Sequence, residues 1–333
     1  MSMWDKIQNK VDKFADGNSG NFNKIVDDSV KKTFKILAGK ENKSTRIPDN
    51  IISFIGASGG VGTSTIVANV ATQLKGMGYS VLVIDANISY PIQYNYLGYS
   101  LQSKNKYDIV SFMNGKCNIG ESINNDKEIS LLYGSNRTIM DLISADKAER
   151  VEEFGKAVEL LRDFFDFILV DVPNMMMLDL VHTCLYISDK IYLIWDENIS
   201  CIPNTEILKK NMLMCGVNYE SKLRLVLNKR TSIQYPRVAI DKLELDLVAV
   251  LPFETSVIEA GLAAKVYITG GASLSKNAPV FVDGIKTIAE KLLEDAGART
   301  NVNIAETEDT DDNSTVENTD NTDDYDNEEG SVE

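Results

Sequence analysis

The chain has 333 residues, of which 44% are apolar, and a formal net charge of −15 at pH 7. No apolar run approaches the about 18 residues that span a bilayer, and the charged start MSMWDKIQNK has no apolar signal segment, so we expect neither a membrane-spanning nor a secreted protein. Four scattered cysteines and one histidine leave almost no material for a zinc site, which favours a cytoplasmic protein with reduced cysteines.

Residues 1–48 carry two amphipathic stretches followed by a polar linker. Trp4, Ile7, Val11 and Phe14 recur at helical spacing and would form one apolar helix face. Three interpretations stay open for these helices: packing on the chain's own core, docking to a partner protein or another subunit, and peripheral contact with the inner, anionic face of a membrane. The second stretch repeats the pattern with Phe22, Val26, Val30, Phe34 and Leu37.

The stretch Ile51–Val70 reads as a buried strand, a glycine-rich turn and the start of a helix. Glycines let the N–H groups of the turn point inward, and the helix start adds a positive dipole, so the stretch is typical of a phosphate cradle. The pattern G-x-x-x-x-G-K-[ST], aligned on Gly62 and Ser64, places Ala57 at its first glycine and Thr63 at its lysine. The loop therefore predicts a nucleotide site that lacks its lysine.

Residues 49–296 alternate strand and helix patterns, which predicts βαβ units. Their apolar strands resemble parallel strands that are buried on both faces. The predicted fold class is thus α/β, a three-layer α/β/α domain with a mostly parallel central sheet. We expect strands at 51–55, 80–85, 129–133, 167–171, 191–195, 223–227 and 247–251, and helices at 64–77, 147–165 and 280–295.

Two carboxylates, Asp85 and Asp171, end predicted strands. Ligands of parallel sheets bind beyond the carboxyl ends of the strands, so both should meet the glycine-rich loop at one edge. Nearby, the run Met175–Met177 is expected in the core, with a partner surface as the alternative. Packing is also expected for Tyr90, Tyr94, Tyr96 and Tyr99.

Residues 297–333 consist mainly of Asp, Glu, Asn, Thr and Ser, which predicts a disordered tail. Residues 301–333 hold thirteen acidic residues and neither Lys nor Arg, which leaves a net charge of −2 for the rest. The acidity is therefore a property of the tail. Two roles stay open for the tail, a solvated segment of mutually repelling charges and a protein-interaction segment.

The motifs together resemble the MinD/ParA-type (deviant Walker A) P-loop ATPases, in the family's own order. SGGVGTST (58–65) resembles their K-G-G-V-G-K-[ST]-T loop, with Ser58 and Thr63 in place of both lysines. The spacing between the switch segments is most similar to the CpaE/TadZ branch. The other matching segments are VLVIDAN (81–87, switch I), FDFILVDVP (165–173, Walker B and switch II), LRLVLNKR (223–230, base contact) and LVAVLPFETSVIEA (247–260, closing segment).

This resemblance implies ATP or ADP with Mg²⁺ as the cofactor. Ser64 would bind Mg²⁺ through its hydroxyl, while Asp85 and Asp171 would orient the ion and its waters. Asn228 would contact adenine, because Lys-Arg follows it rather than the pattern of guanine-specific proteins. The remaining nucleotide-binding positions would be Ser58, Gly59, Gly60, Val61, Gly62, Thr63 and Thr65.

The departures from the family predict negligible hydrolysis, so we name no catalytic residue. Thr63 lacks the charge that neutralises the β- and γ-phosphates during transfer. Ser58 replaces the lysine that, in this family, reaches across an ATP-bound dimer, and Asn87 stands where many members carry a second switch I Asp. Each group that stabilises the charge of a transition state typically contributes several kcal/mol, and its loss slows the reaction accordingly.

We therefore expect a MinD/ParA-like positioning or scaffold protein, a pseudo-ATPase that binds ATP or ADP weakly or not at all. It would recruit a pilus, secretion, conjugation or partition machinery through protein contacts, as a homodimer or as a heterodimer with an active relative. Nucleic acid is not expected, because the body shows no basic surplus. The alternatives are an active partition or localisation ATPase with a lysine from elsewhere, and a bacterial tyrosine kinase-like ATPase domain, which Asp85–Pro91 faintly resembles.

Overall fold

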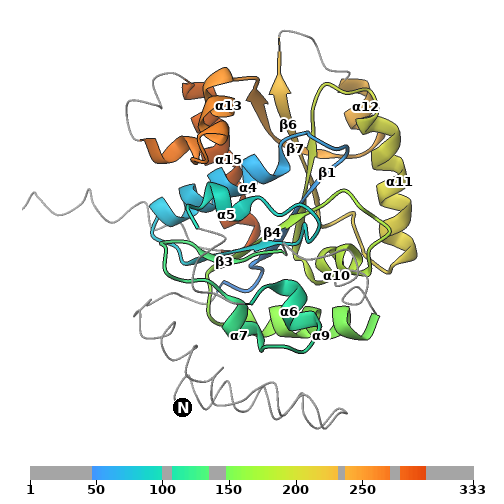
Figure 1. Ribbon diagram of the computed structural model, residues 1–333. Coiled ribbons are helices and arrows are strands. Elements are labelled where there is room, and N and C mark those ends of the chain that lie inside the picture. Colours follow the sequence, from blue (N-terminus) through green and yellow to red (C-terminus); the bar gives the residue numbers. More distant parts are fainter. Residues whose placement is uncertain (1–46, 100–106, 135–147, 232–236, 271–277, 298–333) are drawn as a thin grey trace, which may run out of the picture. The chain divides into compact units, whose positions relative to one another are not determined.

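The computed structural model describes residues 47–99, 107–134, 148–231, 237–270 and 278–297 (Figure 1). Two units divide the chain, Met1–Ala298 and Arg299–Glu333, and every described residue belongs to the first. The amphipathic helices and the acidic tail expected from the sequence lie outside the described residues. Within the described ranges, none of the helices has the length and apolar character of a membrane span.

Seven parallel strands form one sheet in the described part of the chain, and each lies where the sequence predicts a strand. Their order across the sheet is β3-β2-β4-β1-β5-β6-β7. Because all neighbours are parallel, the carboxyl ends of the strands share one edge. The strands are β1 (Ile51–Gly56), β2 (Val81–Asp85), β3 (Ser130–Leu132), β4 (Phe167–Val172), β5 (Lys190–Trp195), β6 (Leu223–Arg230) and β7 (Asp246–Pro252).

The central strands are buried on both faces, as their uninterrupted apolar sequences predict. Every residue of β1, β2 and β4 is buried. Phe54 and Tyr192 stack on neighbouring strands with ring centroids 5.2 Å apart, and Trp195 ends β5 fully buried. The interior of the sheet is therefore mainly apolar. Polar side chains that end a strand lie at the edge of the sheet, where a ligand can reach them.

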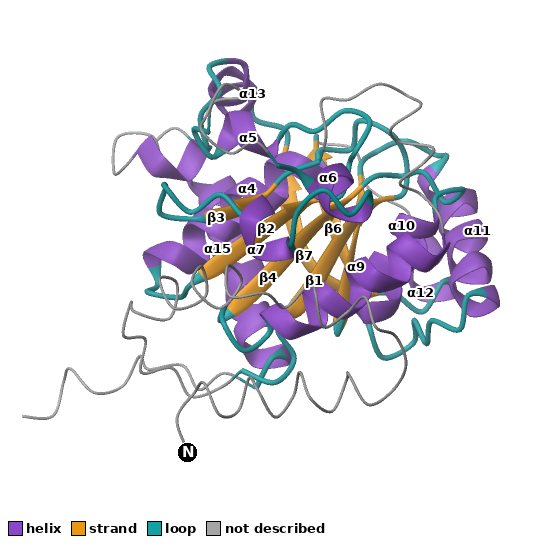
Figure 2. Cartoon of the chain, turned by 60° about the horizontal axis from the view of Figure 1, so that its bottom comes forward, coloured by secondary structure: helices purple, strands orange, loops and turns teal. Residues whose placement is uncertain are grey.

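Helices cover both faces of the sheet, which confirms the three-layer α/β/α prediction (Figure 2). On one face α4 (Thr63–Gly76) packs against β1, β2 and β4, and beside it α15 (Pro279–Asp295) packs against β7. On the other face α10 (Asp179–Ile187) contacts β1 and β4 and is joined by α9 (Ala148–Leu161). The other described helices are α5 (Gln93–Tyr96), α6 (Ile109–Met113), α7 (Ile119–Ser122), α11 (Cys201–Met214), α12 (Arg237–Lys242), α13 (Thr255–Leu262) and the 3₁₀ helix η1 (Tyr267–Gly270).

Arg162 directly follows α9 and connects its end to the amino ends of two strands. Its guanidinium donates to the Ile187 carbonyl at 3.0 Å and forms ion pairs with Glu159 and Asp189. Asp189 also accepts the N–H of Ile51 at 2.9 Å. The side chains of Arg162 and Asp189 are only 14% and 19% exposed, so water screens their interaction little.

Replacing Arg162 by Met should lower the free energy of unfolding by about 2 kcal/mol, because Asp189 would keep a largely buried charge without its partner. Urea denaturation measures this loss. The matched control is Lys156→Met, which removes an exposed ion pair with Glu152 and should cost less than about 0.5 kcal/mol. If both variants lost the same free energy of unfolding, the stabilising role assigned to the Arg162–Asp189 pair would be contradicted.

Candidate functional site

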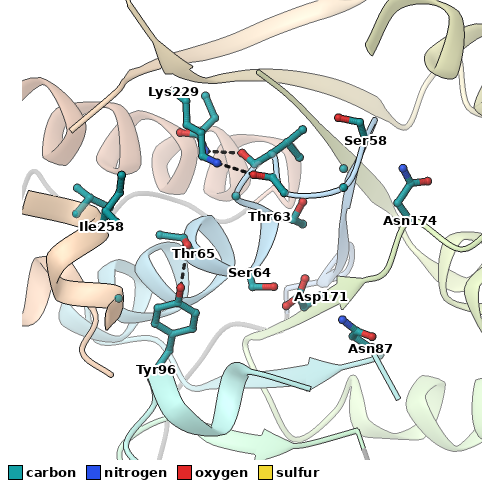
Figure 3. A pocket seen from close by; sticks show the side chains of 18 of the residues that line it. Ser58, Thr63, Ser64, Thr65, Asn87, Tyr96, Asp171, Asn174, Lys229 and Ile258 are labelled. Carbon is teal, nitrogen blue, oxygen red and sulfur yellow. Dashed lines mark hydrogen bonds between the residues drawn. The ribbon is translucent and has the colours of Figure 1, made fainter. Parts of the chain in front are cut away.

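A cavity of about 670 Å³ opens at the carboxyl edge of the sheet (Figure 3). Its wall is formed by the turn after β1, the start of α4, the segments after β2 and β4, the ends of β6 and β7, and α13. Its volume is within the range of small-molecule sites. The structure brings together here most of the residues predicted for the site, namely Ser58, Gly59, Gly60, Val61, Gly62, Thr63, Ser64, Thr65, Asn87, Asp171 and Asn228.

The glycine-rich loop presents its backbone to this cavity. Gly60 and Gly62 have φ angles of 80° and 98°, in the left-handed region that favours glycine. A Cβ atom on Gly59 or Gly60 would meet nothing within 4 Å, so the backbone there is open. The helix α4 begins at Thr63 without a side-chain cap, and the positive end of its dipole therefore faces the cavity. This arrangement suits an anion.

Asn228 supports the loop from the end of β6. Its amide nitrogen donates to the Val61 carbonyl at 2.7 Å, and a Cβ atom on Gly62 would lie only 2.4 Å from that nitrogen. The loop and Asn228 therefore fit together only because residue 62 is glycine. The contact with adenine expected of Asn228 stays a prediction, since the amide nitrogen is used here to hold the loop.

A lysine that the sequence analysis did not single out also reaches the loop. The ammonium of Lys229, labelled in Figure 3, donates to the Gly60 carbonyl, and its Cε atom lies 3.6 Å from the position that a Cβ on Gly62 would take. In the sequence, only its position directly after Asn228 could have indicated that Lys229 contacts the loop. Ser58 and Thr63, at the places of the missing lysines, line the same cavity.

Asp85 is fully buried and accepts three backbone N–H groups, from Asn87 at 3.2 Å, Ile92 at 2.8 Å and Gln93 at 2.9 Å. Burial, and then the negative charge of Asp171, raise the pKa of Asp85 to about 8. Asp85 is not among the cavity's lining residues and anchors the loop that follows β2.

Asp171 lies opposite Asp85 on the neighbouring strand and lines the cavity. Gln93 donates its amide N–H to Asp171 Oδ2 at 2.7 Å. Burial raises the pKa of Asp171, and the hydrogen bonds from Gln93 and Ser64 act against that rise. The predicted metal residues are therefore not equivalent: Ser64 and Asp171 meet at the cavity, whereas Asp85 lies behind them.

Ser64 and Asp171 fit the hard oxygen ligands that Mg²⁺ takes. The amide oxygen Oε1 of Gln93 is buried and has no hydrogen-bond partner in the structure, which leaves a further oxygen close to this pair. Among the described residues, no group of three or more His, Cys, Asp or Glu side chains could hold a metal ion. Water and phosphate oxygens would have to complete the shell.

Two expectations about packing were wrong in part. Tyr90 was expected to pack, but it is 81% exposed, whereas Tyr96 is half-buried at the cavity wall and its hydroxyl lies 3.0 Å from Thr65 Oγ1 at the start of α4 (Figure 3). Met175 and Met177 were expected in the core, yet they are 43% and 95% exposed. They follow β4 in an irregular segment beyond the sheet edge, whereas Met176 between them packs against the core as expected, and the partner surface stays a prediction.

Comparisons with known proteins identify the family. A family model described as an AAA domain (AAA_31) matches residues 49–215, half of the chain. The chain belongs to this AAA domain family. The matched residues include β1, the glycine-rich loop, Asp85 and Asp171.

Relatives and solved structures point to the same fold. The septum site-determining protein MinD of Helicobacter pylori is 29% identical over 126 residues, which cover 37% of this chain and 44% of that protein. The cell division ATPase MinD of Pyrococcus furiosus matches with a TM-score of 0.61 and 25% identity, over 73% of this chain and 99% of that one. MinD of Pyrococcus horikoshii, complexed with Mg-ADP, matches with a TM-score of 0.61 and 22% identity, over 74% and 97%.

In sequence and in fold the chain is thus similar to MinD proteins, as its motifs predicted. It spans less than half the length of the H. pylori relative.

Proposed function

We propose that this chain is a positioning or scaffold protein of the CpaE/TadZ type, which binds ATP or ADP with Mg²⁺ in the cavity and hydrolyses it negligibly. One observation carries the proposal. The cradle keeps its open glycines, its helix start, Ser64 and Asp171, while Ser58 and Thr63 stand at both lysine positions of the loop. Backbone N–H groups and a helix dipole can hold phosphate without a loop lysine, so binding and turnover are separable.

The environment of Asn87 supports slow or absent turnover. Its Oδ1 accepts the N–H of Tyr90 at 3.1 Å, and an amide cannot take a proton from an attacking water. Asp85, the nearby carboxylate, is buried and bonded to backbone N–H groups. Neither group is placed to activate water.

Exposed apolar side chains around the cavity support protein contacts. Tyr90 is 81% exposed, Phe253 46% and Leu262 85%, and all three line the cavity. Exposed apolar clusters with polar surroundings are typical of interaction surfaces. One solved relative is a MinC:MinD complex of Aquifex aeolicus. By analogy we propose protein partners for this chain, including a second copy or an active relative.

Calorimetric titration with Mg·ATP and Mg·ADP, together with a phosphate-release assay, tests the proposal. We expect saturable binding of both nucleotides and phosphate release at the rate of the buffer blank. Steady turnover would instead favour the active ATPase, and no binding by either nucleotide would leave a scaffold without a nucleotide.

Replacing Ser64 by Ala tests the magnesium part separately. The loss of a metal-ligating hydroxyl should weaken nucleotide binding by about tenfold in Mg²⁺ and by much less in EDTA. The matched control is Thr72→Ala, which removes a hydroxyl that donates to the Ala68 carbonyl on the same helix, outside the cavity lining. A Ser64 variant that binds equally in Mg²⁺ and matches the control would exclude this role.

A further inference from the structure

The end of β6 directs two successive side chains to one loop. Successive residues of a regular strand point to opposite faces. Here Asn228 donates to the Val61 carbonyl and Lys229 donates to the Gly60 carbonyl, so both reach the glycine-rich loop. A departure from regular strand geometry must bring them together.

That departure is visible in the backbone. Lys229 has a φ of 53°, in the left-handed region that costs a non-glycine residue about 1 kcal/mol or more, and the β6–β7 register shifts between Leu227 and Arg230. Such irregularities re-aim side chains and occur often beside functional sites. The Cε atom of Lys229 lies 3.6 Å from the position that a Cβ on Gly62 would take. The irregular backbone thus places a lysine beside Gly60 and Gly62, at the wall of the cavity.

We propose that Lys229 supplies the positive charge that Thr63 cannot, and that it binds the β- and γ-phosphates of the nucleotide. This inference rests on the proposed nucleotide binding. A lysine ammonium has three donors, so its bond to Gly60 leaves capacity for phosphate oxygens. Lys229 lines the cavity together with the open backbone of Gly59 and Gly60. The lysine is therefore supplied from another strand.

The charge of Lys229 has a consequence for selectivity. In this proposal the ammonium of Lys229 interacts with the β- and γ-phosphates, and AMP has neither of them. ATP and ADP should therefore depend on Lys229 much more than AMP does. Their affinity should also fall with added salt in the unaltered chain, because salt screens a partly exposed charge.

The test compares Lys229→Met with the unaltered full chain by calorimetric titration of Mg·ATP, Mg·ADP and AMP. Loss of a charged hydrogen bond should weaken ATP and ADP binding by about 10- to 100-fold and leave AMP nearly unchanged. The matched control is Lys209→Met. Lys209 also donates to a backbone carbonyl, that of Leu243, but lies outside the cavity lining, so its loss should leave all three affinities as they were.

Two further variants separate charge from structure. Lys229→Arg keeps the charge and should retain most of the affinity. Thr63→Lys, added to Lys229→Met, returns a lysine to the loop and should restore ATP binding. Thermal denaturation of each variant checks that it is folded.

The outcomes are distinguishable. No nucleotide binding by the unaltered chain would overturn the proposed function and this inference together. Binding by Lys229→Met that equals binding by Lys209→Met would overturn this inference alone. Equal weakening of ATP and AMP, without rescue by Thr63→Lys, would make Lys229 a latch that only shapes the loop, and would also overturn it.

Discussion

Replacing Gly62 by Ala is expected to weaken nucleotide binding by about 100-fold or more while the sheet stays folded. At a φ of 98° an alanine is strained, and its Cβ atom would lie 2.4 Å from Asn228 Nδ2. Asn228 must then move and release the Val61 carbonyl, which it holds at 2.7 Å. The same methyl group would only make ordinary van der Waals contact with the Cε atom of Lys229, at 3.6 Å. The substitution therefore acts on the loop through its own backbone strain and through Asn228.

Gly78→Ala is the matched control for Gly62→Ala. Gly78 follows the carboxyl end of α4 with a φ of 94°, so alanine there bears the same left-handed strain, but its Cβ would meet nothing within 4 Å. Urea denaturation should show that each variant loses about 1 kcal/mol or more. Calorimetric titration with Mg·ATP should show a loss of binding for Gly62→Ala alone. Similar nucleotide affinities in the two variants would contradict the role assigned to the loop.

The strands could be predicted from the sequence because each is a short apolar run buried on both faces. The prediction of 167–171 differs from β4 by a single residue, and the largest error is at 223–227, which ends three residues before β6 does. The helix expected at 147–165 instead ends at Leu161. The next residue, Arg162, forms ion pairs with Glu159 and with Asp189, which is 27 residues away. A local pattern contains no information about that partner.

The candidate site was predictable where strand ends determine it. The loop after β1, Asp171 and Asn228 meet at one cavity because parallel strands place their carboxyl ends together. The positions of Asp85 and Lys229 were not predictable in this way. Asp85 is enclosed by the conformation of the segment after β2, and Lys229 is turned to the loop by irregular backbone at the end of β6.

The carboxylates Asp85 and Asp171 make the stability of the chain depend on pH. Burial raises the pKa of both, and the charge of Asp171 contributes further to the pKa of about 8 at Asp85. In the unfolded chain an aspartate titrates near pH 4, so over the range between these values the folded state binds more protons than the unfolded state. The stabilisation is therefore complete below about pH 4 and is lost as the pH rises through about 8.

The free energy of unfolding of the nucleotide-free chain should thus fall by roughly 3 kcal/mol between pH 5 and pH 8, as measured by urea denaturation. Asp171→Asn should make this fall shallower, because it removes the negative charge beside Asp85 and can still accept the Gln93 N–H through its amide oxygen. Asp49→Asn removes an exposed carboxylate instead and should keep the original slope. A fall that is equally steep in all three proteins would show that the charge of Asp171 does not contribute to the raised pKa of Asp85. The absence of any fall in the unaltered chain would contradict the raised pKa itself.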